Sequence, residues 1–345
     1  MVSNFTSALY DGQSDQLQLV QKDVLEPGIG EILLKVAACG ICGTDVKILQ
    51  GESHSSPPVI TGHEFCGIIE EVGPRVDNVQ VGEFVAVDPN IYCGQCSFCR
   101  EGKINLCRNL QALGVDIDGG FAEYCVAPAK QCYPLPGDLP VETAVLTEPL
   151  SCAIYGNQLA EIHPGDQVLI IGGGIIGHMM VQLARISGAS SIIATDPDAE
   201  RQKQLKSLGV NLTVDPTEND AEEKILDYTH GGAERVIECV GSIPTVEQSI
   251  RLARDGGIVV FFGVSPKDAT AQISPYELYK RDLTLRGSFL NPFTFQKAAR
   301  LISSGRIDFS SLDIARFSLN EINRAIEHQR ARRNLKTFID VSIEE

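Results

Sequence analysis

The sequence lacks an excess of basic residues: 29 Lys and Arg stand against 45 Asp and Glu, and the net charge is -16. A nucleic-acid-binding protein needs a basic face, so this charge argues against DNA or RNA as a partner. It argues equally against binding to an anionic membrane surface. The sequence also lacks any apolar run near the roughly 20 residues that span a bilayer, so we expect no membrane segment.

The start of the chain lacks the features of a secretion signal, because residues 1–6 contain neither a basic segment nor an apolar block. The eleven cysteines do not form an even set, and the chain is long. A disulfide framework is therefore disfavoured, and we expect metal-bound thiols and small, buried free thiols instead. These observations predict a cytoplasmic protein.

Four cysteines lie in one short stretch, at Cys93, Cys96, Cys99 and Cys107. The spacing Cys-x2-Cys-x2-Cys-x7-Cys can fold a small lobe around one metal ion, with a thiolate at each corner of a tetrahedron. Zinc is the usual occupant of such a site. Because four protein ligands complete the coordination shell, we predict a structural zinc ion with no open position.

The length of 345 residues and an apolar content of 43% predict two domains with packed cores. Before about residue 150, apolar runs at 32–38, 66–72 and 84–87 alternate with Gly and Pro, as in a small β-barrel or sandwich. Later, short apolar strands alternate with helical patterns, which predicts an α/β fold with a parallel sheet covered on both faces. The expected strands are 168–171, 191–194, 235–239, 258–262 and 283–286, and the expected helices are 175–187 and 199–208.

Two further helices are expected near the end of the chain. Residues 292–304 and 319–331 carry apolar side chains at helical spacing, and Ser318 to Glu321 has the pattern of a helix start. The acidic stretch 215–223 is expected to be a solvated surface loop.

A dinucleotide site is indicated by residues 172–177, which read Gly-Gly-Gly-Ile-Ile-Gly between an apolar strand and an apolar helix. Small residues let backbone N–H groups approach a pyrophosphate, and the helix N-terminus adds positive potential. Asp196, 19 residues after Gly177, can bind the ribose hydroxyls and repel a 2′-phosphate, which favours NAD over NADP; the nearby Arg201 works against that preference. The expected cofactor-binding residues here are Gly172, Gly174, Ile175, Ile176, Gly177, Asp196 and Arg201.

A second metal site is indicated by Cys42, in Cys-Gly-Thr-Asp, and by His63, in Gly-His-Glu. A lone His or Cys is more often a core residue than a ligand. Among the six histidines, His63 stands out because Glu64 follows it and a glycine precedes it.

Taken together, these motifs resemble the medium-chain, zinc-dependent alcohol dehydrogenases, and within them the polyol branch typified by sorbitol dehydrogenase. The resemblance covers essentially the whole chain. It is carried by residues 40–45, 62–67, the four-cysteine stretch, 148–150, 172–177 and 238–241.

The resemblance implies a Rossmann domain at 153–288 and a β-rich, GroES-like catalytic domain at 1–152, to which 289–345 return. It implies one catalytic zinc, bound by Cys42 and His63 with a carboxylate from Glu64 or Glu148. Glu64 is expected to be the closer ligand, and Glu148 a direct or water-linked one. Asp45 would orient the His63 imidazole.

The implied reaction is transfer of hydride from a secondary alcohol to NAD, with Thr44 passing the alcohol proton outward. The family often ends this relay with a histidine three residues after Thr44, where this chain has Lys47. Lysine is a poor proton acceptor at neutral pH unless it is desolvated. Val240, Val264 and Phe289 are the further residues that the resemblance assigns to cofactor binding.

The substrate is left open by the sequence. Sorbitol-type enzymes often carry an Arg-Tyr pair after Gly-x-Phe, whereas Leu290 and Asn291 follow Gly-Ser-Phe here. A sugar alcohol, a phosphorylated polyol or a diol fits, and threonine, as in threonine 3-dehydrogenase, is an alternative. Family members are usually dimers or tetramers.

Three rival hypotheses belong to other classes. A zinc-free quinone reductase on this fold usually lacks the cysteine lobe and the Cys/His pair. A non-catalytic NAD-binding protein would not need Cys42, His63 and Glu64. A four-cysteine nucleic-acid module is disfavoured by the acidic charge.

Overall fold

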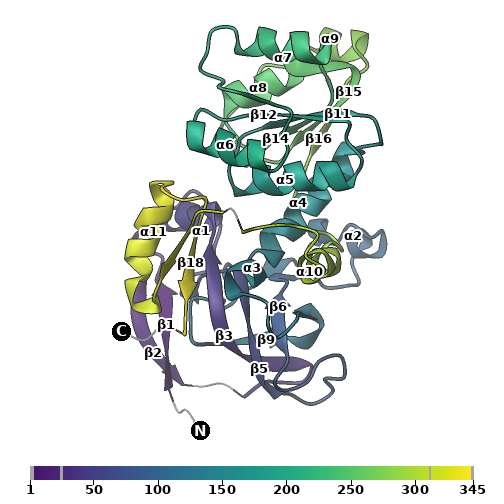
Figure 1. The fold of residues 1–345 in the computed structure, drawn as a ribbon. Coiled ribbons are helices and arrows are strands. Elements are labelled where there is room, and N and C mark those ends of the chain that lie inside the picture. The colour runs from purple at the N-terminus through teal and green to yellow at the C-terminus, as the bar shows by residue number, and fades with distance from the viewer. Residues whose placement is uncertain (1–3, 24–25, 311, 343–345) are drawn as a thin grey trace. The chain divides into compact units, whose positions relative to one another are not determined.

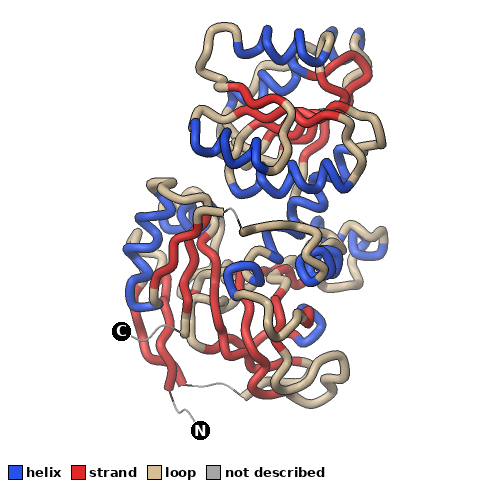
Figure 2. The backbone as a smooth tube through the Cα atoms, viewed as in Figure 1, coloured by secondary structure: helices blue, strands red, loops and turns tan. Residues whose placement is uncertain are grey.

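The computed structural model describes residues 4–23, 26–310 and 312–342, and the chain divides into two compact units. Unit 1 contains Met1–Ser151 and Pro292–Glu345, and unit 2 contains Cys152–Asn291. The chain therefore leaves the first unit and returns to it near its end. Figure 1 and Figure 2 show that strands dominate unit 1 and that helices flank the sheet of unit 2.

Over the described residues, unit 1 contains a seven-stranded sheet, a three-stranded sheet and a β7–β8 pair. In the largest sheet the order is β10-β6-β5-β3-β18-β17, and β9 also pairs with β3. Its strands are β3 (Glu31–Ile41), β5 (Glu64–Val72), β6 (Phe84–Val87), β9 (Tyr124–Pro128), β10 (Cys132–Pro134), β17 (Ile314–Phe317) and β18 (Lys336–Asp340). The others are β1 (Asn4–Tyr10), β2 (Gln18–Asp23), β4 (Val59–Ile60), β7 (Asn90–Ile91) and β8 (Gln111–Ala112).

The helices of unit 1 are short. They are α1 (Gly43–Leu49), α2 (Ser97–Arg100), α3 (Val141–Ala144), α10 (Phe295–Ser303) and α11 (Ile322–Arg330), with 3-10 turns η1 (Ile104–Leu106), η2 (Ala129–Gln131) and η3 (Leu319–Glu321). The helix α4 (Thr147–Ala160) begins in unit 1 and ends in unit 2. The core of unit 1 includes Phe65, Phe121 and Ile41, so the large sheet is buried on the side that these residues share.

Unit 2 has a parallel sheet of six strands within the described residues, in the order β13-β12-β11-β14-β15-β16. This order runs outward from β11 in both directions, so the fold has a switch point between β11 and β14, where α/β proteins bind ligands. The strands are β11 (Gln167–Ile171), β12 (Ser191–Thr195), β13 (Leu212–Val214), β14 (Ala233–Glu238), β15 (Ala253–Phe261) and β16 (Thr284–Gly287).

Helices cover both faces of this sheet, α5 and α6 on one side and α7 and α8 on the other (Figure 1). They are α5 (Ile175–Ile186), α6 (Ala199–Ser207), α7 (Ala221–Thr229), α8 (Ile243–Leu252) and α9 (Pro275–Lys280). Because both faces are covered, Leu169, Val236 and Val259 in neighbouring strands are fully buried. The predicted parallel α/β sheet and the predicted β-rich region are both confirmed.

One expectation for a loop was wrong. Residues 215–223 were expected to be solvated surface loop, but α7 begins at Ala221, which is 3% exposed. The helical face of α7 starts with this small apolar residue and continues to the buried Ile225. The three acidic neighbours Asp220, Glu222 and Glu223 led to the prediction of a loop, although acidic residues are favourable at a helix N-terminus.

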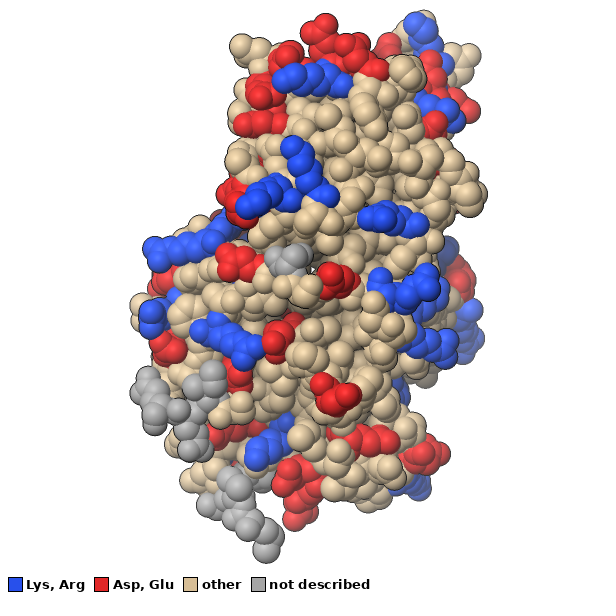
Figure 3. Space-filling model, viewed as in Figure 1, with Lys and Arg blue, Asp and Glu red and all other residues tan. Residues whose placement is uncertain are grey.

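Among the described residues, no helix combines the length and apolarity that crossing a membrane requires. On the face drawn in Figure 3, acidic side chains are interspersed with basic ones. The acidic side chains on this face are therefore not gathered in one patch (Figure 3).

Candidate active site

Three possible metal ligands meet at the ends of neighbouring strands in unit 1. Cys42 follows β3 and caps α1, His63 immediately precedes β5, and Glu64 is the first residue of β5. One ligand atom from each of these residues lies within 4.8 Å of the other two. They meet because β3 and β5 are antiparallel, so the end of one strand lies beside the start of the other.

Asp45 connects Cys42 and His63. Its Oδ2 accepts a hydrogen bond from the backbone N–H of Cys42 at 2.8 Å, and its Oδ1 lies 3.3 Å from Nδ1 of His63. Within the described residues, neither Oδ1 of Asp45 nor Nδ1 of His63 has a well-aligned hydrogen bond, although both are buried. The Asp45 carboxylate thus faces Nδ1 of the imidazole, which leaves Nε2 as the nitrogen for a metal.

The charge state of His63 reflects its surroundings. Burial disfavours the imidazolium, but the carboxylate of Asp45 and the sulfur of Cys42 outweigh burial and raise the pKa of His63 well above its ordinary value. A concentration of negative charge at a buried imidazole is what a bound cation would offset. The donor set of sulfur, imidazole and carboxylate therefore suits a zinc ion with an open position.

Lys336, which sequence reasoning missed, also belongs to this site. Its Nζ forms an ion pair with Oε2 of Glu64, and the two side chains are 3% and 2% exposed. The residues lie 272 positions apart in the sequence. No local pattern around a lysine in a C-terminal strand could have indicated this pair.

The other predicted catalytic residues lie on α1 and α4. The Cys42 sulfur lies 3.7 Å from Oγ1 of Thr44, in the first turn of α1, and Lys47 is partly buried in the same helix. Glu148 is in the first turn of α4 and is 8% exposed. Among the described residues, it does not join the group of ligand atoms within 4.8 Å of one another, which contains Glu64 instead.

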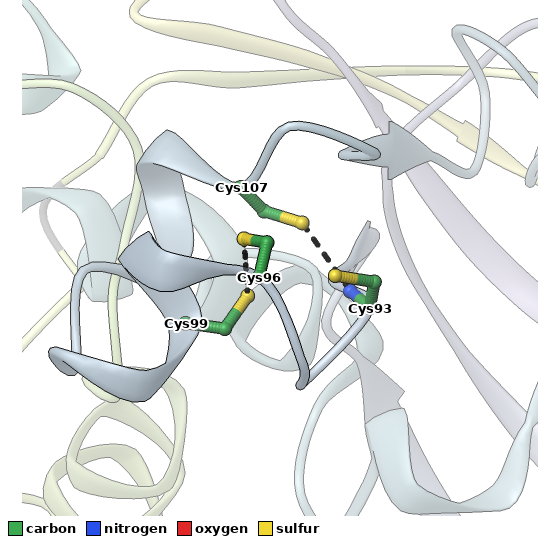
Figure 4. Close-up of side chains that lie close together, drawn as sticks. All are labelled: Cys93, Cys96, Cys99 and Cys107. Atoms are coloured by element: carbon green, nitrogen blue, oxygen red, sulfur yellow. Dashed lines mark hydrogen bonds between the residues drawn. The ribbon is translucent and has the colours of Figure 1, made fainter.

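The four-cysteine stretch forms a second cluster, between β7 and β8. Figure 4 shows the side chains of Cys93, Cys96, Cys99 and Cys107 turned toward one another. One sulfur from each lies within 4.8 Å of the others. Sγ of Cys107 accepts hydrogen bonds from the backbone N–H groups of Cys93, at 3.3 Å, and of Asn109, at 3.4 Å. This donor set suits a closed tetrahedral zinc site.

The pKa values of Cys93, Cys96 and Cys99 differ from one another, in part because of nearby backbone N–H groups. Those of Arg108 and Cys99 lower the pKa of Cys96 to about 6, and those of Gln95 and Cys96 lower the pKa of Cys93. Desolvation and the neighbouring sulfur of Cys96 raise the pKa of Cys99 to about 12. The loop therefore favours thiolates at some positions, and a cation is needed before all four can be ionised together.

The remaining cysteines are free thiols. Cys39, Cys66, Cys125 and Cys132 are buried, as expected. Cys152 and Cys239 are only partly buried.

The glycine-rich loop of unit 2 joins β11 to α5. Gly172 has a φ of 102°, which favours glycine, and a Cβ on Gly177 would run into the backbone oxygen of Gly172. Gly174 is the N-cap of α5, and Ile175 and Ile176 form its partly exposed first turn. The loop therefore presents bare backbone at a helix N-terminus, as pyrophosphate binding requires.

Asp196 follows β12 and is tied to this loop. Its Oδ2 accepts from the N–H of Gly173 and its Oδ1 from the N–H of Asp198, each at 2.8 Å. Nη1 of Arg201 lies 3.9 Å from Oδ2 of Asp196. A carboxylate and a guanidinium thus lie together beside the loop, so the two features with opposite cofactor preferences are neighbours.

Three other predicted cofactor contacts are surface residues. Val240, Val264 and Phe289 are 41%, 72% and 53% exposed. A Cβ on Gly172 would lie 2.7 Å from Cγ2 of Val240, so Val240 adjoins the loop. Exposed apolar side chains of this kind are available to cover a flat ring.

Comparison with known proteins gives a consistent result. Residues 28–137 match the model of the alcohol dehydrogenase GroES-like domain, and residues 176–304 match that of the zinc-binding dehydrogenases. An L-threonine 3-dehydrogenase of Thermococcus kodakarensis is 35% identical over 91% of each chain. D-arabinitol dehydrogenase 1 of Uromyces fabae is 32% identical over 96% of each chain.

A solved structure agrees with these relatives. It is a crystal structure described as a zinc-binding dehydrogenase from Sinorhizobium meliloti 1021, bound to NADP. The two chains are 40% identical, the TM-score is 0.94, and the match covers 98% of this chain and 100% of that chain.

Proposed function

We infer the function of this chain from its family: it belongs to the medium-chain, zinc-dependent alcohol dehydrogenases, polyol branch. The chain is an oxidoreductase that acts on an alcohol or polyol. We propose that it transfers hydride from a secondary alcohol of a polyol to NAD and produces a ketose or ketone. The observation that carries the proposal is the cluster of Cys42, His63 and Glu64.

These three residues would hold the catalytic zinc. When bound, zinc would supply a Lewis acid that lowers the pKa of a substrate hydroxyl, and the nicotinamide would accept the hydride. Three protein ligands leave a position for the substrate oxygen. Cys42 and Glu64 supply negative charge, and Asp45 keeps Nε2 of His63 available by facing Nδ1.

The hydroxyl proton needs a separate route, because hydride carries away two electrons and only one hydrogen. Thr44 is proposed to accept this proton and pass it on, and its Oγ1 lies 3.7 Å from the Cys42 sulfur. Lys47, on the same helix, is the proposed outer end of the relay. Glu148 is proposed as the outer carboxylate, reaching the metal directly or through water.

A structural zinc ion is proposed at Cys93, Cys96, Cys99 and Cys107, in addition to the catalytic one. Metal analysis of the purified wild type, Cys42→Ser and Cys96→Ser variants tests this count. Each variant should lose one class of zinc. A wild type that retains only one zinc ion after gentle chelation-free purification would contradict the proposal.

NAD is the proposed cofactor because Asp196 stands beside the glycine loop. The NADP in the Sinorhizobium structure and the proximity of Arg201 favour NADP as the alternative. The test is kcat/KM with each cofactor for wild type, Asp196→Asn and Arg201→Ala. If NAD is preferred, Asp196→Asn loses that preference, and a wild type that works better with NADP contradicts the assignment.

The substrate class is proposed to be a sugar alcohol, a phosphorylated polyol or a diol. The threonine dehydrogenase relative supports threonine as a second candidate. An absorbance assay of reduced-cofactor formation distinguishes these candidate substrates. It is run with panels of polyols, polyol phosphates and diols, and with L-threonine. A threonine kcat/KM far above that of every polyol would overturn the first choice.

We also propose a homodimer or homotetramer in the cytoplasm, as is usual for the family. Light scattering of the purified chain tests the assembly, and a monomer would contradict it.

A further inference from the structure

A buried ion pair adjoins the proposed catalytic zinc site. Lys336 opens β18, which pairs antiparallel with β3, and β3 pairs in turn with β5, where Glu64 lies. Nζ of Lys336 contacts Oε2 of Glu64, and both side chains are almost fully buried. A lysine is rarely buried this deeply, so its charge must be offset by specific neighbours.

The middle strand makes room for this pair. Gly40 lies opposite Glu64 in the β3–β5 register. A Cβ on Gly40 would overlap Oε2 of Glu64 and would lie 3.0 Å from Cε of Lys336. The carboxylate and the lysine stem therefore cross the bare backbone of β3, and a side chain there would push them apart.

The neighbours of Lys336 are the metal-site residues themselves. The Lys336 ammonium pairs with the carboxylate of Glu64, and a ligand atom of Glu64 lies within 4.8 Å of ligand atoms of Cys42 and His63. The positive end of Lys336 therefore lies against the carboxylate of the proposed ligand set, where it would oppose a cation bound by the same carboxylate.

We propose that Lys336 is a positioning residue for the zinc site: by holding Oε2 of Glu64 it leaves Oε1 as the oxygen for the metal, and it weakens the hold of Glu64 on the ion. The inference rests on the proposed function, because it assumes zinc at Cys42, His63 and Glu64. It adds a residue and a role that the ligand set does not include. A carboxylate held in this way would offer one oxygen to the ion, which would leave a coordination position for the substrate.

Charge balance predicts the effect of removing the lysine. In the metal-free protein, a Glu64 without its partner is a buried, uncompensated anion, so the apo state becomes less stable. Binding of zinc would relieve that cost, and the ion would no longer be opposed by a nearby ammonium. Loss of the lysine charge therefore lowers apo stability and raises zinc affinity.

The test is competition for zinc between the full chain and a chromophoric chelator, together with thermal unfolding of the apo protein. Cys42→Ser identifies which class of zinc belongs to the catalytic site. Lys336→Met should bind that zinc about tenfold more tightly than wild type, because the repulsion between the ammonium and the cation is removed. Its apo form should melt several degrees lower.

Matched variants separate charge from packing. Lys336→Arg keeps the charge and should have wild-type zinc affinity. Lys336→Gln keeps a donor for Oε2 without the charge and should show a smaller gain; it also serves if Lys336→Met does not fold. Lys35→Met, an exposed position on the same strand as Gly40, should change neither quantity.

A double-mutant cycle tests whether Lys336 acts through Glu64. In the Glu64→Gln background, Lys336→Met should no longer raise zinc affinity. The proposal is overturned if the lysine variants bind the catalytic zinc as wild type does or more weakly, even where apo stability falls, because a merely structural ion pair predicts that outcome. It is overturned equally if the gain persists without the Glu64 carboxylate.

Failure of the proposed function would give a different result. Wild type and Cys42→Ser would then contain the same amount of zinc, whatever residue stands at position 336.

Discussion

The two candidate metal clusters of unit 1 are built in opposite ways. The cysteine lobe takes four identical donors from residues 93–107, and its sulfurs are tuned by backbone N–H groups nearby in sequence. The Cys42–His63–Glu64 cluster takes three different donors from two strand ends, and charged side chains tune it, including one from β18. A locally built site can be closed by its own loop, whereas a site with an open position depends on the sheet that assembles it.

The largest expected effect separates the clusters by activity. Cys42→Ser should remove the catalytic zinc and lower turnover by about 10³-fold, because Lewis-acid stabilisation contributes several kcal/mol. The fold should survive, since Cys42 follows β3 and is partly exposed. Zinc content, steady-state rates and thermal unfolding measure the three effects. Normal activity in this variant would show that the ligand assignment is wrong.

The corresponding cysteine-to-serine change in the cysteine lobe should affect stability more than activity. Cys96→Ser should lower the free energy of unfolding by about 3 kcal/mol, because binding of a structural zinc is part of folding. Denaturant unfolding and zinc analysis provide the measurement, with the exposed neighbour Ser97→Ala as control. An unchanged unfolding midpoint with full zinc content would contradict a structural role and remove the contrast between the clusters.

Asp45→Asn tests whether the mixed site depends on its charged partners. The variant removes the carboxylate charge that faces His63, while its amide oxygen can still accept the hydrogen bond from the Cys42 N–H. Affinity for the catalytic zinc should fall by about tenfold. Chelator competition measures it, and zinc in the cysteine lobe serves as the internal control. Equal loss from both sites would point to general unfolding instead.

The smallest expected effect is on the metal-free lobe at mildly acidic pH. The pKa of Cys96 is lowered to about 6 in the folded chain, below the value of about 8.5 for an unfolded thiol. Its contribution to stability is therefore complete above about pH 8.5 and is lost as pH falls through 6. Thermal unfolding of apo wild type and apo Cys96→Ser between pH 5 and 9 measures the difference. A difference that grows toward acid pH would contradict the assigned thiolate.

The parts that sequence predicts well are those whose cause is local. Alternation of short apolar strands and helices led to β11, α5 and β12 within a residue or two of their observed ends. The cysteine spacing indicated a cluster that the fold brings together. The helix start at Ser318 is a capping box with Glu321, a contact between residues three positions apart.

The parts that sequence did not reveal depend on pairing between distant strands. Lys336 reaches Glu64 only because β18 lies beside β3 and β3 beside β5, and no residue near either one signals the contact. The choice between Glu64 and Glu148 could not be made from the sequence for the same reason, because each is a glutamate with suitable neighbours in the sequence. The strand register brings Glu64 to Cys42 and His63.

The pairing of β7 with β8 gives the cysteine lobe a property that the other cluster cannot have. Asn90 lies opposite Ala112, so the chain enters and leaves the lobe at adjacent points. The segment between them is an insert with its ends already joined, and a short turn could bridge the gap without stretching the host sheet. Such a segment can be inserted, deleted or moved to another protein as one continuous piece. The residues around Cys42 come from separate strands, so a change in one of them requires compensating changes in the others.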